Sequence, residues 1–193
     1  MNSIEKWQKE MLLNLIGNKR YKHTISVVET VEELSNYYNF NLKKAKIAAW
    51  LHDLGKIKPR EKYMEYLEKY NIELDQYEIQ SAELAHGKLS AAMASVEFDI
   101  HDEEILEAIR VHTTGKIDMS MIDKIVFLAD YIEPSREHEA CAKARKLAFE
   151  GKLEDSLIMA MDETIKFVIE RRQLLHIDTI KARNQLIVKG GSN

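Results

Sequence analysis

Residues 47–56 read IAAWLHDLGK, an apolar helical run that ends in two ionisable side chains. His52 and Asp53 stand side by side, and Gly55 follows them, a residue suited to the left-handed conformation that ends many helices. Two ionisable groups at a buried helix end cost free energy unless something compensates them, and a metal ion is the usual compensation. The stretch therefore predicts a helix that leads into a metal site.

Composition sets the fold class around this stretch. The chain has 193 residues, and 45% of them are hydrophobic, enough for one domain with a substantial core. Charged residues make up 31%, whereas there are only 7 glycines and 2 prolines, a balance typical of helix-rich proteins. We therefore expect a single all-α domain.

Charge and cysteine content narrow the function classes. The formal net charge of -4 argues against a general nucleic-acid-binding protein. Cys141 is the only cysteine, so no disulfide forms within the chain, and a reducing cytoplasm is the simplest location. The N-terminal residues resemble no signal peptide, and no apolar run approaches the roughly 20 residues that span a bilayer. We expect a cytoplasmic protein that contacts neither nucleic acid nor membrane.

Helical periodicity recurs along the whole chain. Ser3 is expected to cap a first helix, and a second helix covers about residues 19–38. Pro59 prevents continuation of the helix that carries His52, and residues 71–85 are expected to be partly loop. Further helices are expected at about residues 60–70, 87–98, 102–111, 120–132, 137–150, 153–174 and from about 178 onward.

Four histidines and two aspartates lie at helix ends or on inward helix faces. His23 shares a face with Val27, His112 closes the apolar row of its helix, and Asp130 extends another apolar row. The full set is His23, His52, Asp53, His86, His112 and Asp130. Any one of them can be an ordinary hydrogen-bonded core residue, but the whole set is difficult to bury without a metal.

Five short motifs carry a resemblance to a known family. The order of His23, the His52-Asp53 pair and Asp130 resembles the HD-domain metal-dependent phosphohydrolases. The motifs are RYKHT at 20–24, AAWLHDLGK at 48–56, LAHG at 84–87, IRVHTTG at 109–115 and IVFLADYIEPSR at 125–136. Together they resemble one branch more closely, the YqeK-type symmetrical diadenosine tetraphosphate hydrolases, from Arg20 to about Asn184.

This resemblance implies both a fold and an activity. The fold is an all-helical HD bundle that forms one domain over residues 1–193, with an HD core at about 18–135 and C-terminal helices at about 136–190 packed on it. The activity is cleavage of diadenosine tetraphosphate into two ADP by a metal-activated hydroxide at a dinuclear iron site, in which Mn, Co, Ni or Zn could replace iron. The implied metal ligands are His23, His52, Asp53 and Asp130.

The chemistry of the residues agrees with a dinuclear centre. Imidazole and carboxylate ligands together favour first-row transition metals, and the set is too rich for one four-coordinate zinc ion. Two metals bridged by Asp53 would lower the pKa of a bound water and clamp phosphoryl oxygens. The expected catalytic group is Asp53, Lys56, His86 and His112. His86 and His112 are either additional metal ligands or groups that face the phosphate, and the sequence leaves both roles open.

Cations near the site predict how a polyphosphate would be held. Lys56 lies at a helix end after the HD pair, and Arg20 lies one turn before His23. Positions matching Arg20, Lys56, Thr113 and Arg136 contact phosphates in the resembling family, and the motif TIKARNQL places Arg183 and Asn184 at ribose or base. The other substrate contacts expected are Asp53, His86, His112 and Asp130. For each cation, ordinary surface charge is the plain alternative.

Two other functions fit part of the sequence. One is an HD phosphohydrolase that acts on a mononucleotide or a guanosine polyphosphate alarmone. The other is a non-catalytic HD module that senses a nucleotide, although such a module predicts a broken ligand set and every expected ligand is present. In each case the partner is a small-molecule nucleotide, and apolar residues such as Trp7 allow a homodimer. His101, His138 and His176 are expected at the surface.

Overall fold

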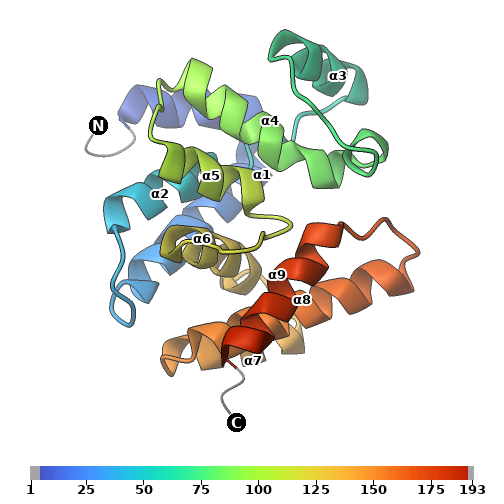
Figure 1. The fold of residues 1–193 in the computed structure, drawn as a ribbon. Helices are drawn as coiled ribbons and strands as arrows, with labels where there is room; N and C mark the ends of the chain where they lie inside the picture. Colours follow the sequence, from blue (N-terminus) through green and yellow to red (C-terminus); the bar gives the residue numbers. More distant parts are fainter. Residues whose placement is uncertain (1–4, 191–193) are drawn as a thin grey trace.

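The regular structure is entirely helical across residues 5–190, the part of the chain that this computed structural model describes (Figure 1). The elements are α1 (Lys6–Leu34), α2 (Leu42–Leu51), α3 (Arg60–Lys69), the 3-10 turn η1 (Glu78–Gln80), α4 (Ala82–Glu97), α5 (Glu103–Val111), α6 (Met121–Ile132), α7 (Glu139–Phe149), α8 (Leu153–Glu170) and α9 (Ile177–Gly190). The prediction of an all-α fold is confirmed.

The long element α1 contains the junction between the two helices predicted at the N-terminus. Gly17 lies inside it with φ +76° and ψ 164°, so the helix is broken at this residue. Glycine adopts this conformation readily because it has no Cβ. The expected cap Ser3 lies outside the described residues. In the structure Glu5 precedes the helix, and its backbone N–H donates to the side chain of Gln8.

The segment before α4 is partly loop, as the sequence predicts. Residues 71–81 are irregular apart from η1, and the Asp75 side chain accepts hydrogen bonds from the backbone N–H groups of Tyr77 and Glu78. Helix α4 then begins at Ala82, earlier than the predicted start at residue 87. His86 therefore lies within a helix rather than at the end of a loop.

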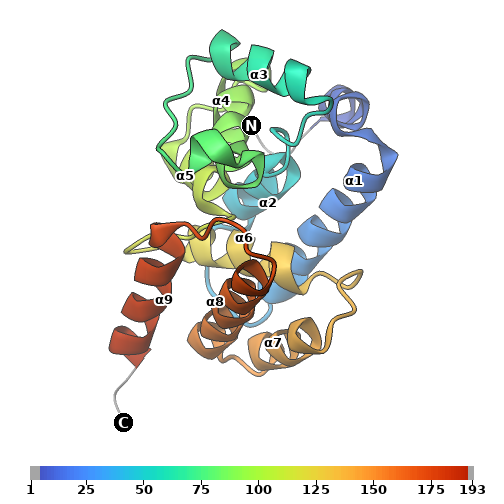
Figure 2. The same ribbon diagram turned by 90° about the vertical axis from the view of Figure 1, so that its right-hand side faces the viewer.

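Helix α6 is the centre of the bundle. It packs against α1, α2 and α5 and also against α7 and α8, and Figure 2 shows it between these two groups. Ser120 and Asp123 form the capping box that the sequence predicts at its start. Its apolar residues 125–129 are all buried. Asp130 follows them directly, so this helix brings a carboxylate into the middle of the molecule.

The three C-terminal helices lie at the end of the molecule opposite α3 (Figures 1 and 2). Helix α8 packs against both α7 and α9, and α6 connects this group to the preceding helices. Within residues 5–190, no helix combines the length and the apolar character needed to cross a membrane.

Candidate active site

The four predicted metal ligands, together with His86 and His112, come together from five helices. Helix α2 begins at Asn41, whose side chain accepts from the backbone N–H of Lys44, and its apolar face carries the HD pair into the core. As a result His52 is 0% and Asp53 2% exposed. The sources are α1 for His23, the end of α2 for His52 and Asp53, α4 for His86, the end of α5 for His112 and α6 for Asp130.

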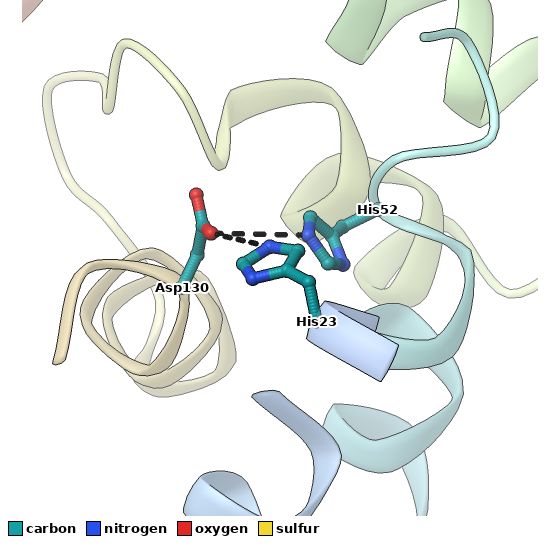
Figure 3. Close-up of side chains that lie close together, drawn as sticks. All are labelled: His23, His52 and Asp130. Carbon is teal, nitrogen blue, oxygen red and sulfur yellow. Dashed lines mark ion pairs between the residues drawn. The ribbon is translucent and has the colours of Figure 1, made fainter. Parts of the chain in front are cut away.

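His23, His52 and Asp130 form a compact cluster (Figure 3). Nε2 of His23 lies 3.0 Å from Oδ1 of Asp130, and Nε2 of His52 lies 4.0 Å from the same oxygen. The donor atoms of the three residues all lie within 4.8 Å of one another. One metal ion could therefore contact all three side chains with ordinary ligand distances of about 2 Å.

Asp53 directs its two carboxylate oxygens at two different pairs of imidazoles. Its Oδ2 lies 3.6 Å from Nε2 of His52 and 3.8 Å from Nε2 of His23. Its Oδ1 lies 3.3 Å from Nε2 of His86 and 3.7 Å from Nε2 of His112. A carboxylate placed between two such pairs has the geometry of a bridging ligand.

Three of the imidazoles are fixed by the backbone of their own helices. Nδ1 of His52 lies 2.7 Å from the carbonyl oxygen of Ala49, and Nδ1 of His112 lies 2.7 Å from that of Ile109. Nδ1 of His86 lies 2.8 Å from the carbonyl oxygen of its own helix three residues earlier. Because a carbonyl only accepts, each Nδ1 carries the proton and each Nε2 keeps its lone pair for a metal.

Two buried polar atoms at the centre have no hydrogen-bond partner among the described residues: Nε2 of His52 and Oδ1 of Asp53. Buried polar groups in native proteins are nearly always satisfied, so orphaned atoms require an explanation. Both atoms are of types that bind metals. The imidazole nitrogens of His86 and His112 and a carboxylate oxygen of Asp130 lie within 4.0 Å of one or the other. The residues present therefore fit a transition-metal centre.

Burial and neighbouring charges set the protonation states. Burial lowers the pKa of His52 to about 4, so its imidazole is neutral at physiological pH. Burial acts to raise the pKa of Asp53, but the surrounding imidazoles and the Lys56 ammonium hold it well below its usual value. Burial likewise acts to raise the pKa of Asp130, whose side chain is 22% exposed, but its hydrogen bond with His23 helps to hold that pKa well below the usual range. Neutral imidazoles beside ionised carboxylates are the forms that bind metals.

Three predicted phosphate contacts lie against the acidic residues of the site. The Arg20 guanidinium contacts Oδ2 of Asp53, and Nζ of Lys56 lies 3.7 Å from its Oδ1. Arg136 donates to Oδ1 of Asp130 at 3.0 Å. These cations therefore surround the carboxylates on several sides.

A cavity of about 980 Å³ opens beside these groups. Six predicted site residues line it: Lys56, His86, His112, Thr113, Asp130 and Arg136. The rest of its wall includes the C-terminal half of α8 and the chain leading into α9, with Phe167 and His176 among its residues. The volume lies within the usual range of small-molecule sites, roughly 300–1,000 Å³.

Two glycines allow close packing of three segments: the turn at residues 52–55, α4 and α5. A Cβ atom on Gly55 would collide with the backbone carbonyl of His86, and one on Gly87 would collide with the carbonyl of Arg110. The backbone of α4 therefore touches both neighbouring segments, which fixes the position of His86 between them. Neither the motif LAHG nor its spacing shows this packing role.

Sequence reasoning missed Glu133, which is 1% exposed. Its Oε1 lies 3.2 Å from Nδ1 of His23. Burial acts to raise its pKa, but hydrogen bonds, chiefly from Ser135, hold it below the usual value, so the carboxylate is ionised. The signal that could have identified it is its place three residues after Asp130, immediately before Pro134.

The prediction that His176 lies at the surface is wrong. Its side chain is 6% exposed, and its Nε2 lies 2.7 Å from Oδ2 of Asp75. Asp75 is 101 residues away in sequence and belongs to the loop before α4, so periodicity within one helix gives no signal for the pair. His101 and His138 are exposed, as predicted.

Arg183 and Asn184 do not line the cavity, and neither do the predicted substrate contacts Arg20 and Asp53. Nε of Arg183 donates to Oδ1 of Asp162 on α8 at 2.6 Å, and its Nη1 donates to Oδ1 of Asn184 at 3.2 Å. Their contact with ribose or base stays a prediction.

Comparisons with known proteins agree with this geometry. The family model described as HD domain matches residues 20–135. The chain is 36% identical over 170 residues to the symmetrical bis(5'-nucleosyl)-tetraphosphatase of Halalkalibacterium halodurans, covering 88% of this chain and 90% of the relative. It is 34% identical over 168 residues to the protein of the same name from Bacillus subtilis, covering 87% and 89%.

A solved structure is similar over nearly the full length. It is described as a predicted HD superfamily hydrolase involved in NAD metabolism from Clostridium acetobutylicum. The TM-score is 0.87 at 42% sequence identity, and the match covers 94% of this chain and 95% of the other. With histidine and aspartate side chains gathered around the HD pair, and with relatives matched over most of both chains, the protein belongs to the HD-domain family, in its branch of symmetrical bis(5'-nucleosyl)-tetraphosphatases.

Proposed function

We propose that this chain hydrolyses diadenosine tetraphosphate symmetrically into two molecules of ADP. Several of its relatives bear the name of that activity. The observation that carries the proposal is the buried carboxylate of Asp53, which has two imidazole nitrogens within 3.8 Å of each of its oxygens. This arrangement lies beside a cavity large enough for a nucleotide.

The metal centre is assigned to two groups of ligands that share Asp53. One group is His23, His52, Asp53 and Asp130, and the other is Asp53, His86 and His112. We assign iron, as the resemblance to this branch implies, and the mixed imidazole and carboxylate set is one that suits first-row transition metals. If bound there, a pair of such ions would supply a water of lowered pKa and would neutralise charge on the phosphoryl oxygens.

The cations of the site hold the polyphosphate. Arg20 and Lys56 contact the two oxygens of Asp53 from different elements, and Arg136 contacts Asp130. Their positions allow them to bind phosphate oxygens on either side of the reacting phosphorus. Thr113 adds a hydroxyl donor beside His86 and His112.

The products define where the substrate lies. Two ADP molecules form only when water attacks one of the two central phosphorus atoms and the bond from that atom to the central bridging oxygen breaks. The oxygen of water joins the attacked phosphoryl group and the bridging oxygen leaves with the second ADP. The two protons of water pass to the two new terminal phosphates and are released to solvent as these ionise. A central phosphoryl group must therefore lie next to Asp53, with the two adenosines at opposite ends of the bound molecule.

Product identity tests this proposal directly. The protein, loaded with Fe(II) without oxygen, is incubated with diadenosine tetraphosphate in H₂¹⁸O, and the nucleotides are separated by ion exchange. We expect ADP as the only product, with ¹⁸O in the terminal phosphate of half of it. AMP and ATP as products would refute the symmetrical register. Absence of turnover, with metal bound, would refute the activity.

A matched pair of histidine variants provides the control. His52→Ala removes a buried predicted ligand and should abolish turnover. His101→Ala removes a histidine whose side chain is 73% exposed, and it should leave turnover unchanged. We place the reaction in the cytoplasm, where a chain with a single cysteine stays reduced.

A further inference from the structure

His23 is held differently from the other three imidazoles of the site. Backbone carbonyls occupy Nδ1 of His52, His86 and His112. Nδ1 of His23 instead faces a carboxylate oxygen of Glu133 at 3.2 Å, across 110 residues of sequence. The orientation of the His23 ring therefore depends on Glu133, which directly follows α6.

Glu133 is itself firmly held. The backbone N–H of Ser135 donates to its Oε2 at 2.7 Å, and the Ser135 hydroxyl donates to its Oε1. The residue follows the last residue of α6 and is 1% exposed. A buried, anchored carboxylate can accept a hydrogen bond without losing much side-chain freedom in doing so.

Two carboxylates compete for the proton of the His23 ring. Oδ1 of Asp130 lies 3.0 Å from Nε2, and Oε1 of Glu133 lies 3.2 Å from Nδ1. If Asp130 alone acted, the neutral ring would carry its proton on Nε2, the atom that faces the metal ligands. Glu133 favours the tautomer with the proton on Nδ1, which leaves the Nε2 lone pair free.

We infer that Glu133 is a positioning residue for metal binding, which accepts the Nδ1 proton of His23 in a hydrogen bond and so presents Nε2 of His23 to the metal. This inference rests on the metal site of the proposed function. A carboxylate on the far nitrogen of a ligand histidine also increases the basicity of the ligand, and loss of such a partner typically lowers metal affinity about 10- to 100-fold.

A purely structural role would have different consequences. Glu133 also lies 3.7 Å from Nε of Arg136 and supports the turn through Ser135. If support of this turn were its only role, removal of the Ser135 hydroxyl and removal of the Glu133 charge would have similar effects. The two roles are therefore separable by variants.

The test compares metal affinity with fold stability. Glu133→Gln keeps the size of the side chain and removes its charge, and Ser135→Ala removes one support of the turn. Co(II) dissociation constants are measured by competition with a chelator at pH 7.5, with thermal unfolding of each metal-free protein alongside. We expect Glu133→Gln to weaken Co(II) binding about 10-fold or more and Ser135→Ala to change it less than 3-fold. Equal affinities for Glu133→Gln and the wild type would overturn the inference.

Asp123→Asn is the matched control, because Asp123 is a carboxylate 1% exposed at the other end of α6. It should lower the unfolding temperature of the metal-free protein and leave the Co(II) affinity unchanged. A loss of Co(II) affinity equal to that of Glu133→Gln would assign the effect to α6 as a whole and would overturn the inference.

A measurement on the wild type needs no variant to fold. Imidazole ¹⁵N NMR of the Zn(II)-loaded protein should show His23 bound through Nε2 with a proton on Nδ1. Metal on Nδ1 would overturn the inference and leave the proposed function standing. Failure of the wild type to bind Co(II) or Zn(II) at all would overturn both.

Discussion

Nε2 of His86 lies 3.0 Å from Nε2 of His112, with the rings edge to face. Both rings use Nδ1 to donate to a backbone carbonyl, so both Nε2 atoms carry lone pairs that repel at this distance. The hydroxyl of Thr113 is within 3.2 Å of both nitrogens but has one proton to donate. A cation between the rings removes the repulsion, which favours a metal-ligand role for both.

Metal content tests the role of this pair. In the proposed centre, His112→Asn removes a ligand from one metal ion and leaves His23, His52 and Asp130 for the other. We expect the metal content of the anaerobically loaded protein, measured by plasma emission spectrometry, to fall from two ions per chain to one. The double variant His23→Asn/His52→Asn should lose the other ion. Two ions per chain in His112→Asn would contradict the assignment.

Gly87→Ala should damage both stability and catalysis. The added Cβ would collide with the carbonyl of Arg110, so α4 and α5 must move apart and carry the two histidines with them. Such overpacking typically costs about 1–3 kcal/mol, measured by denaturant unfolding, and we expect kcat to fall at least about 10-fold. Gly190→Ala is the control, because a Cβ there meets no atom within 4 Å, and it should be neutral.

Lys56→Gln should weaken substrate binding. A charge-assisted contact to phosphate contributes roughly 1.5–3 kcal/mol, so we expect KM to rise about 10- to 100-fold and its dependence on salt concentration to decrease. Lys143→Gln serves as the control, because Lys143 is 61% exposed and pairs with Glu139 on α7. KM is measured for both variants by steady-state kinetics at two ionic strengths. Equal KM values for the two variants would contradict a phosphate contact at Lys56.

Acid should destabilise the metal-free protein through His52. Its pKa is lowered by burial to about 4 in the folded state, against about 6.5 in the unfolded chain. Its contribution to stability is therefore present above pH 6.5 and is lost as the pH falls to about 4, by up to roughly 3 kcal/mol. Urea unfolding of the chelated protein at pH 7, 5.5 and 4 measures this loss. His52→Asn should show a flatter profile, and an unchanged profile would contradict this origin.

The contact between the buried His176 and the partly exposed Asp75 should support the cavity wall. His176→Ala removes the contact between the chain before α9 and the loop before α4, so we expect a lower unfolding temperature and a higher KM. His101→Ala removes a similar His–Asp contact, with Asp99, at an exposed position and should change neither quantity. Calorimetry and kinetics on the two variants would refute the idea if they gave the same result.

The sequence predicted those parts of the site that depend on local pattern. The apolar run before His52 and the row leading to Asp130 each predict an inward side chain at a helix end, and the structure places both there. Periodicity also placed His23 and His112 on inward faces, whereas the resemblance supplied the predicted ligand roles and the family. The start of α4 was predicted too late, because the capping signal before Ala82 is weak and no side chain caps that helix.

Long-range contacts could not be predicted. Glu133 contacts His23 and His176 contacts Asp75, each pair more than 100 residues apart in sequence, and no period within one helix reports such a contact. The approach of α4 to α5 at Gly87 is equally a property of packing. A homodimer stays a prediction.

Two histidines of the site are oriented by hydrogen bonds within their own helices, so neither orientation depends on the rest of the fold. His52 and His112 each follow the last turn of a helix and use a carbonyl of that turn, where helical partners run out. The ring orientation is thus encoded within four consecutive residues. In a designed protein, two such helix ends placed beside a carboxylate would present two correctly oriented imidazole nitrogens. Only the spacing between the helices would then need to be designed.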